Sequence, residues 1–152
     1  MGDVPYVSDN ARELARMRRL VEGLGEAELA RWVNESWTVA GILGHIAFWD
    51  GRALALTRKL VAGIPFTDAD DEPEEIDWVN DASLAFIHAV PPGTAARAAL
   101  QVAEETDRSI AALPPELAAT AWPLNDASPL NLSRADHRGE HLDEIEEALA
   151  GT

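Results

Sequence analysis

Apolar residues recur every three or four positions along most of this chain, which is the spacing of one face of an α-helix. No segment alternates between apolar and polar residues over a useful length, so we expect no β-sheet. The clearest apolar stripe lies in the longest predicted helix and consists of Val39, Ile42, Ile46, Trp49, Ala53, Leu56 and Leu60. The pattern predicts helices over residues 8–24, 38–62, 73–90, 94–113 and from 129 or 132 to 149, with a short extra helix near 25–33.

Capping and breaking residues support these boundaries. Ser8, Thr38 and Thr94 can cap helix N-termini, and Pro73 stands where proline is favoured at a first helical position. The acidic segment 63–73 between two helices is expected to be a mobile, solvated loop. The fold class is therefore all-α, and long amphipathic helices joined by loops favour an up-and-down-type bundle.

Composition narrows the class of protein. The 152 residues, 47% of them hydrophobic, are enough for a single domain covering residues 1–152. Acidic residues outnumber basic ones by 27 to 12, and a net charge of −15 disfavours binding to nucleic acids and to anionic membranes. No apolar run is long enough to span a membrane and no signal peptide is evident, so we expect a cytoplasmic protein. Without cysteine, any thiol chemistry needs a small-molecule thiol.

Three histidines form the candidate site. His137 and His141 are four apart in the last predicted helix and project from one face of it, whereas His45 borders the apolar stripe of the longest helix. Three imidazoles on two helices would leave one coordination position of a metal open, as in catalytic zinc sites. Nitrogen ligands also suit nickel, copper and iron. Two alternatives stay open at the level of the residues, since such a pair can be solvated and a histidine like His45 can be a hydrogen-bonded core residue.

Other side chains near these histidines are weaker candidates. Trp49 is four residues after His45 and could wall a pocket, and Arg52 is seven after it and could bind the carboxylate of a cofactor or substrate. An ordinary core tryptophan and a surface arginine are the alternatives. Asp107 could be the carboxylate partner of a metal-bound histidine. His88 is expected only to interact with the dipole at the C-terminus of its helix.

Two segments carry a family resemblance. SWTVAGILGHIAFWDGRAL (36–54) resembles the signature second helix of the DinB/YfiT-like superfamily, in which a Trp-Ser/Thr opening precedes a helix with a single histidine. DHRGEHLDEIEEAL (136–149) resembles the last helix of that superfamily, with its paired histidines. The resemblance implies a four-helix bundle with short extra helices in the loops. It also implies a divalent metal, commonly zinc or nickel, held by residues that match His45, His137 and His141.

The resemblance also directs the functional hypothesis. Characterised relatives include bacillithiol transferases and mycothiol-dependent enzymes such as the maleylpyruvate isomerase N-terminal domain, in which the metal activates the thiol of a cofactor. It therefore implies a metal-dependent thiol S-transferase whose partners are a small-molecule thiol and an electrophile, and a homodimer, a state common among relatives. The alternatives are a metal-dependent hydrolase that needs no thiol and a non-enzymatic, dimeric, stress-related bundle with a vestigial metal site. The chain departs from the family pattern at Gly41, where an acidic residue often completes a capping box, and in the loop 113–129.

Overall fold

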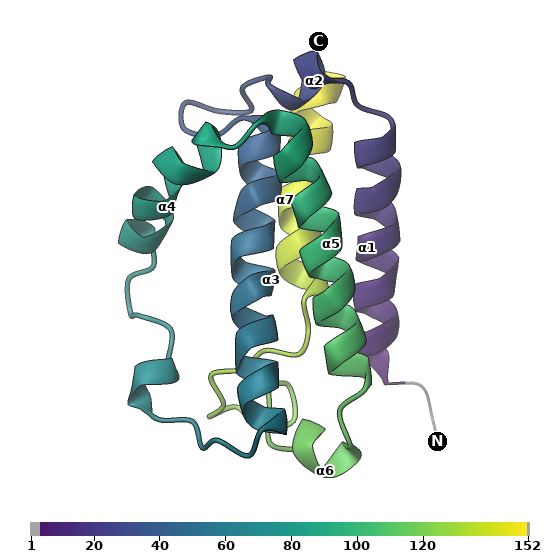
Figure 1. The fold of residues 1–152 in the computed structure, drawn as a ribbon. Coiled ribbons are helices and arrows are strands. Elements are labelled where there is room, and N and C mark those ends of the chain that lie inside the picture. The colour runs from purple at the N-terminus through teal and green to yellow at the C-terminus, as the bar shows by residue number, and fades with distance from the viewer. Residues whose placement is uncertain (1–3, 152) are drawn as a thin grey trace.

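The computed structural model describes residues 4–151, and within that range it contains seven α-helices and no strand. The four helices of 16 residues or more, α1, α3, α5 and α7, form the bundle, and Figure 1 shows α4 beside α3 at its edge and α7 behind α3 and α5. The predicted all-α bundle is therefore confirmed. The helices are α1 (Pro5–Glu22), α2 (Glu26–Leu29), α3 (Val39–Val61), α4 (Asp77–Ala89), α5 (Pro92–Ala111), α6 (Pro115–Ala118) and α7 (Ala135–Ala150), with a 3-10 turn η1 (Asp68–Asp70) between α3 and α4.

The apolar core runs the length of α3. This helix packs most extensively against α5, while α1 contacts both α5 and α7. Of the predicted stripe, only Leu60 at the end of α3 is partly exposed. One cluster of buried residues joins the four long helices, and a second closes the other end of the bundle with α6 and the segment before α7. None of the described helices is both long and apolar enough to cross a membrane.

Several predicted helix ends were wrong by a few residues. α1 begins at Pro5, and Ser8 lies inside the helix, where its hydroxyl donates to the Pro5 carbonyl. α4 begins at Asp77, four residues after Pro73, and α5 begins at Pro92, before the predicted cap Thr94. The acidic loop is tied to the bundle, because the Lys59 ammonium binds both carboxylate oxygens of Asp70 at 2.7 and 2.8 Å.

α7 also starts later than predicted, because hydrogen bonds hold the segment before it in an extended form. The Trp122 N–H donates to the Leu130 carbonyl, and the Leu132 N–H donates to the Trp122 carbonyl. The buried Asn10 side chain of α1 then accepts from the backbone N–H groups of Arg134 and Ala135 at 2.7 and 3.0 Å. A side chain from another helix thus supplies the N-terminal cap of α7.

α4 is fastened to the start of α3 through two glycines. Thr38 caps α3 as predicted, with the Gly41 N–H donating to its Oγ1 at 2.9 Å. A Cβ on Gly41 would lie 2.3 Å from Nε2 of His88, and one on Gly44 would lie 2.5 Å from the Ile87 side chain. The absence of side chains at both positions therefore lets the end of α4 approach α3 closely.

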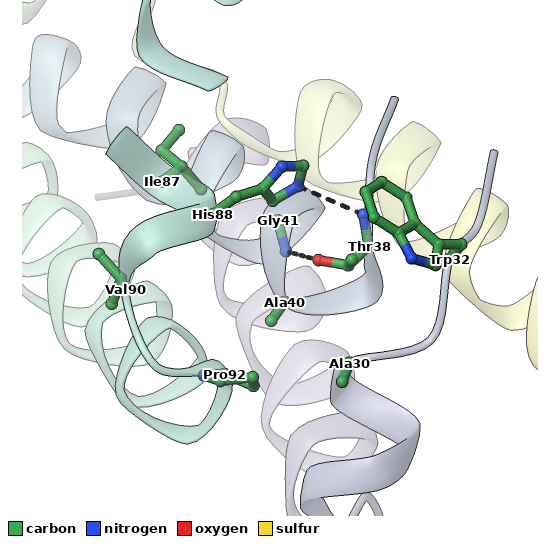
Figure 2. Close-up of a pocket in the computed structure, with 9 residues that line it drawn as sticks. All are labelled: Ala30, Trp32, Thr38, Ala40, Gly41, Ile87, His88, Val90 and Pro92. Carbon is green, nitrogen blue, oxygen red and sulfur yellow. Dashed lines mark hydrogen bonds between the residues drawn. The ribbon is translucent and has the colours of Figure 1, made fainter. Parts of the chain in front are cut away.

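His88 has a larger role than an interaction with the helix dipole. Its Nε2 accepts from the Thr38 N–H at 3.4 Å, beside a cavity of about 250 Å³ that Figure 2 shows between the ends of α3 and α4. The ring also lies edge-on to Trp32 and Trp37, each with its centroid 5.5 Å away. An acidic residue at position 41 would displace this ring, which explains the departure from the capping-box pattern.

Candidate metal centre

The three predicted histidines converge between α3 and α7. Each can offer one ring nitrogen such that all three nitrogens lie within 4.8 Å of one another. The centroid of the His45 ring is 5.2 Å from that of His137 and 4.7 Å from that of His141. His137 and His141 lie on successive turns of α7, and His45 faces them from α3. The helical spacing therefore places two rings on one side of the site, and bundle packing supplies the third.

Burial keeps two of the rings neutral. Burial lowers the pKa of His45 to about 4, and the nearby His141 ring adds to the effect. Burial lowers the pKa of His137 to about 2, with smaller contributions from the charges of His141 and Arg134. Neutral imidazole is the form that binds a metal, so both rings are ready to act as ligands at neutral pH.

The spacing of the ring nitrogens in the cluster fits a transition metal. Nε2 of His45 lies 3.3 Å from Nε2 of His137, and two nitrogen ligands on a tetrahedral zinc ion at about 2.05 Å are also about 3.3 Å apart. The buried Nδ1 atoms of all three rings have no hydrogen-bond partner among the described residues. Nδ1 of His141 is 3.1 Å from Oε1 of Glu144, but without the geometry of a hydrogen bond. Three imidazoles with two Nε2 atoms in contact and with Nδ1 atoms that no other group satisfies suit zinc or nickel.

Two cavities meet at the histidines. The larger, of about 380 Å³, is lined by His45, Trp49, Arg52, Glu72, Ile76, Asn80, Pro129, Asn131, Arg134, His137, Glu140 and His141. The smaller, of about 260 Å³, is lined by Asn34, Trp37, Ile42, His45, Asn80, His141 and Glu144. A small molecule in either cavity can therefore reach the histidine cluster.

A family model for the DinB superfamily matches residues 10–145, which is most of the chain. The chain belongs to the DinB superfamily. The match includes all three histidines and the Trp37–Thr38 opening from which the resemblance was inferred. We found no significant match to a curated protein or to a solved structure.

Trp49 and Arg52 both line the larger cavity of this DinB-superfamily protein, and their predicted ligand-binding role stays a prediction. Trp49 is mostly buried, and its Nε1 donates to Oδ1 of Asn80 on α4 at 3.0 Å. Arg52 is partly buried and donates to the carbonyls of Pro129 and Asp70 at 3.2 and 2.8 Å. Both residues thus connect α3 to the segments that enclose the cavity.

Two arginines four apart, Arg134 at the N-cap of α7 and Arg138 within it, lie next to the histidine pair of this DinB-superfamily protein. Nε of Arg134 and Nε of Arg138 donate to the two carboxylate oxygens of Asp50 at 2.9 Å each. Arg138 also donates to both oxygens of Asp107 at 3.0 and 2.8 Å. Asp107 therefore pairs with Arg138, and its predicted partnership with a metal-bound histidine was wrong.

Sequence reasoning missed this ion network and the role of α4. Asp50 and Arg138 are fully buried and Arg134 is 7% exposed, although charged residues are rarely buried unless paired. Asp50 could have been singled out, because it follows Phe48 and Trp49 within the apolar stretch of α3. Asn80 borders both cavities, but nothing in its local sequence marks it.

Proposed function

We propose that the protein binds one divalent transition metal, zinc or nickel, through His45, His137 and His141, and catalyses thiol S-transfer to an electrophile. The observation that carries this proposal is the convergence of three imidazoles beside a cavity of about 380 Å³. Three protein ligands leave a coordination position for a reactant, whereas structural sites use four. A mycothiol- or bacillithiol-type thiol is the proposed co-substrate, because the chain has no cysteine.

Different residues of the chain would have different roles in such a reaction. A bound metal supplies Lewis acidity that favours the thiolate form of a thiol. His45 and His137 present neutral nitrogens, since burial keeps their pKa values low. Trp49 shields one side of the cavity from water, and its hydrogen bond to Asn80 holds α4 over the histidines. The cavity that contacts all three histidines has room for the electrophile beside the thiol.

Metal content tests the first half of the proposal. We would measure it by mass spectrometry on untagged protein after incubation with zinc or nickel, for wild type, His45→Ala and His137→Ala. The proposal expects about one metal per chain in wild type and a loss in both variants. His88→Gln is the matched control, because it also removes a histidine but lies outside the cluster and can still accept from Thr38. Wild-type protein without metal would overturn the proposal.

Thiol consumption tests the second half. Metal-loaded protein is mixed with a small thiol and 1-chloro-2,4-dinitrobenzene, and loss of thiol is followed with and without protein. The proposal expects turnover in wild type and His88→Gln, and none in His45→Ala. Hydrolysis of a nitrophenyl ester without any thiol would instead favour the metal-dependent hydrolase. A metal-loaded protein with neither activity would favour the non-enzymatic bundle.

A further inference from the structure

The larger cavity contains a buried guanidinium that the metal site does not use. Arg134 is 7% exposed, and its Nε donates to Asp50 at 2.9 Å. Within residues 4–151 this is the only hydrogen bond of its side chain, yet Arg134 lines the cavity beside His137. A guanidinium has five N–H donors in a planar fork. The terminal nitrogens of Arg134 are not among the buried polar atoms that lack a partner, so they are open to the cavity. The remaining donors of Arg134 are therefore available to a ligand in the cavity.

Arg134 and Arg52 are the two arginines that line the cavity, together with the carboxylates of Glu72 and Glu140. Asp50 offers only one carboxylate oxygen to Arg134, because the other oxygen of Asp50 accepts from Arg138. Arg52 lines the same cavity, and its hydrogen bonds to Pro129 and Asp70 go to neutral carbonyls. Burial lowers the pKa of Arg52, the nearby carboxylate of Glu72 raises it, and the positive charge of Arg134 lowers it, so Arg52 and Arg134 lie close enough to influence each other. A carboxylate that contacts the unpaired donors of Arg134 would be attracted by both guanidinium groups, which offsets the repulsion from Glu72 and Glu140.

We infer that the cavity binds a small organic carboxylate through the guanidinium of Arg134, with Arg52 as its second cation, so that the rest of the molecule lies against His45, His137 and His141. The planar fork of arginine matches a carboxylate better than a point charge does. The carboxylate belongs to the electrophile or to the thiol. A net charge of −15 repels anions in general, so an anion that enters this cavity is selected by these arginines.

A carboxylate site here defines the substrate class of the proposed enzyme and rests on that proposal for its catalytic meaning, but binding can be measured without metal. We would titrate chelator-treated full-length protein with benzoate and with benzamide, a neutral molecule of nearly the same shape, by calorimetry. We expect benzoate to bind and benzamide to bind at least about tenfold more weakly, because a charge-assisted hydrogen bond is lost. Equal affinity for the two probes would overturn the inference.

Variants tie the binding to the arginines. Arg134→Lys keeps the positive charge beside Asp50 but removes the planar fork, and we expect benzoate affinity to fall at least about tenfold. If its circular dichroism shows that it is not folded, Arg52→Gln takes its place, because Arg52 is only partly buried. Arg58→Gln is the matched control, since it removes an exposed arginine of α3 that pairs with Glu105. Wild-type affinity in the folded arginine variant, or an equal loss in the control, would contradict the inference.

Two further measurements show whether the carboxylate belongs to the thiol or to the electrophile. They also distinguish failure of this inference from failure of the proposed metal centre. In zinc-loaded protein, 3-mercaptopropionate binding more tightly than 2-mercaptoethanol, with the difference lost in Arg134→Lys, would place the carboxylate on the thiol. Equal binding of these thiols, with benzoate still preferred over benzamide, would place it on the electrophile. A protein that binds one metal but does not prefer benzoate contradicts only this inference. A protein that prefers benzoate but takes up no metal contradicts only the proposed metal centre.

Discussion

The buried carboxylate of Asp50 gives the sharpest test of how the site is held. Replacing it by asparagine keeps the size of the side chain but removes its charge and turns one acceptor into a donor. Both oxygens of Asp50 accept from arginine Nε atoms at 2.9 Å, so the new amide N–H₂ would face one of these donors. Asp50 and Arg138 are fully buried, and solvent cannot replace the lost partner.

The expected loss of stability depends on which hydrogen bonds each arginine keeps in the Asp50→Asn variant. Arg138 retains two bonds to Asp107 and one to the Asn10 carbonyl, but its buried Nε loses a charged acceptor. Arg134 loses its only charged partner and can turn toward the cavity. Removing one partner of a buried ion pair costs about 3–5 kcal/mol, and total stabilities are about 5–15 kcal/mol. We therefore expect Asp50→Asn to lose a large part of the free energy of unfolding.

The assay is denaturant unfolding of metal-free protein, followed by tryptophan fluorescence and circular dichroism. Metal must be absent because binding to the folded state adds its own stability. The control is Glu105→Gln, which makes the same chemical change in an exposed pair with Arg58, where a loss below about 1 kcal/mol is expected. If Asp50→Asn lost no more than this control, the claim that a buried ion network holds α7 would be refuted.

Two further predictions concern α4 and pH. Gly41→Ala places a Cβ 2.3 Å from Nε2 of His88, so we expect the free energy of unfolding in denaturant to fall by about 1–3 kcal/mol. The same change made in the His88→Ala variant should cost less, because the ring is gone. Equal losses in both backgrounds would rule out a clash with this ring. Burial lowers the pKa of His45 to about 4 and that of His137 to about 2, below the unfolded value of 6.5. Their contribution to stability is therefore fully present above pH 6.5; the share of His45 is lost between pH 6.5 and about 4, and that of His137 continues to fall to about pH 2. Unfolding of metal-free protein at a series of pH values should show a decrease of about 1.4 kcal/mol per histidine per pH unit in that window, and His45→Asn should remove one share; a flat profile would contradict the burial of these rings.

The helical class and the pairing of His137 with His141 could be predicted from the sequence because both depend on local spacing. The stripe from Val39 to Leu56 follows the helical repeat, and all of it is buried. His137 and His141 share a helix face for the same reason, although their meeting with His45 also required the family resemblance. Helix ends were harder to predict where a residue distant in sequence caps the helix. The start of α7 is set by Asn10, which is more than 120 residues away along the chain.

The surroundings of the histidines were not predictable, because their partners come together only in the folded chain. Arg134 and Arg138 look like ordinary surface charges on an acidic helix, and only their position opposite Asp50 makes them buried. Asn80 becomes part of the site because Gly41 and Gly44 let α4 approach α3 and because Trp49 donates to it. A helical wheel of α4 shows neither the close approach to α3 nor the hydrogen bond from Trp49, because both involve residues outside α4.

The position of the ion network beside the histidine pair of α7 suggests why the protein keeps buried charges there. Replacing buried ion pairs by apolar residues is often neutral or stabilising, so stability alone does not account for Asp50 and Arg138. Apolar ridges tolerate a slip of one helical turn, since they would bury similar surface in either register. Charged pairs do not tolerate it, because a slip would leave buried charges without partners. Arg134 and Arg138 alternate along α7 with His137 and His141, so the register that satisfies Asp50 is also the one that brings His45 to the histidine pair.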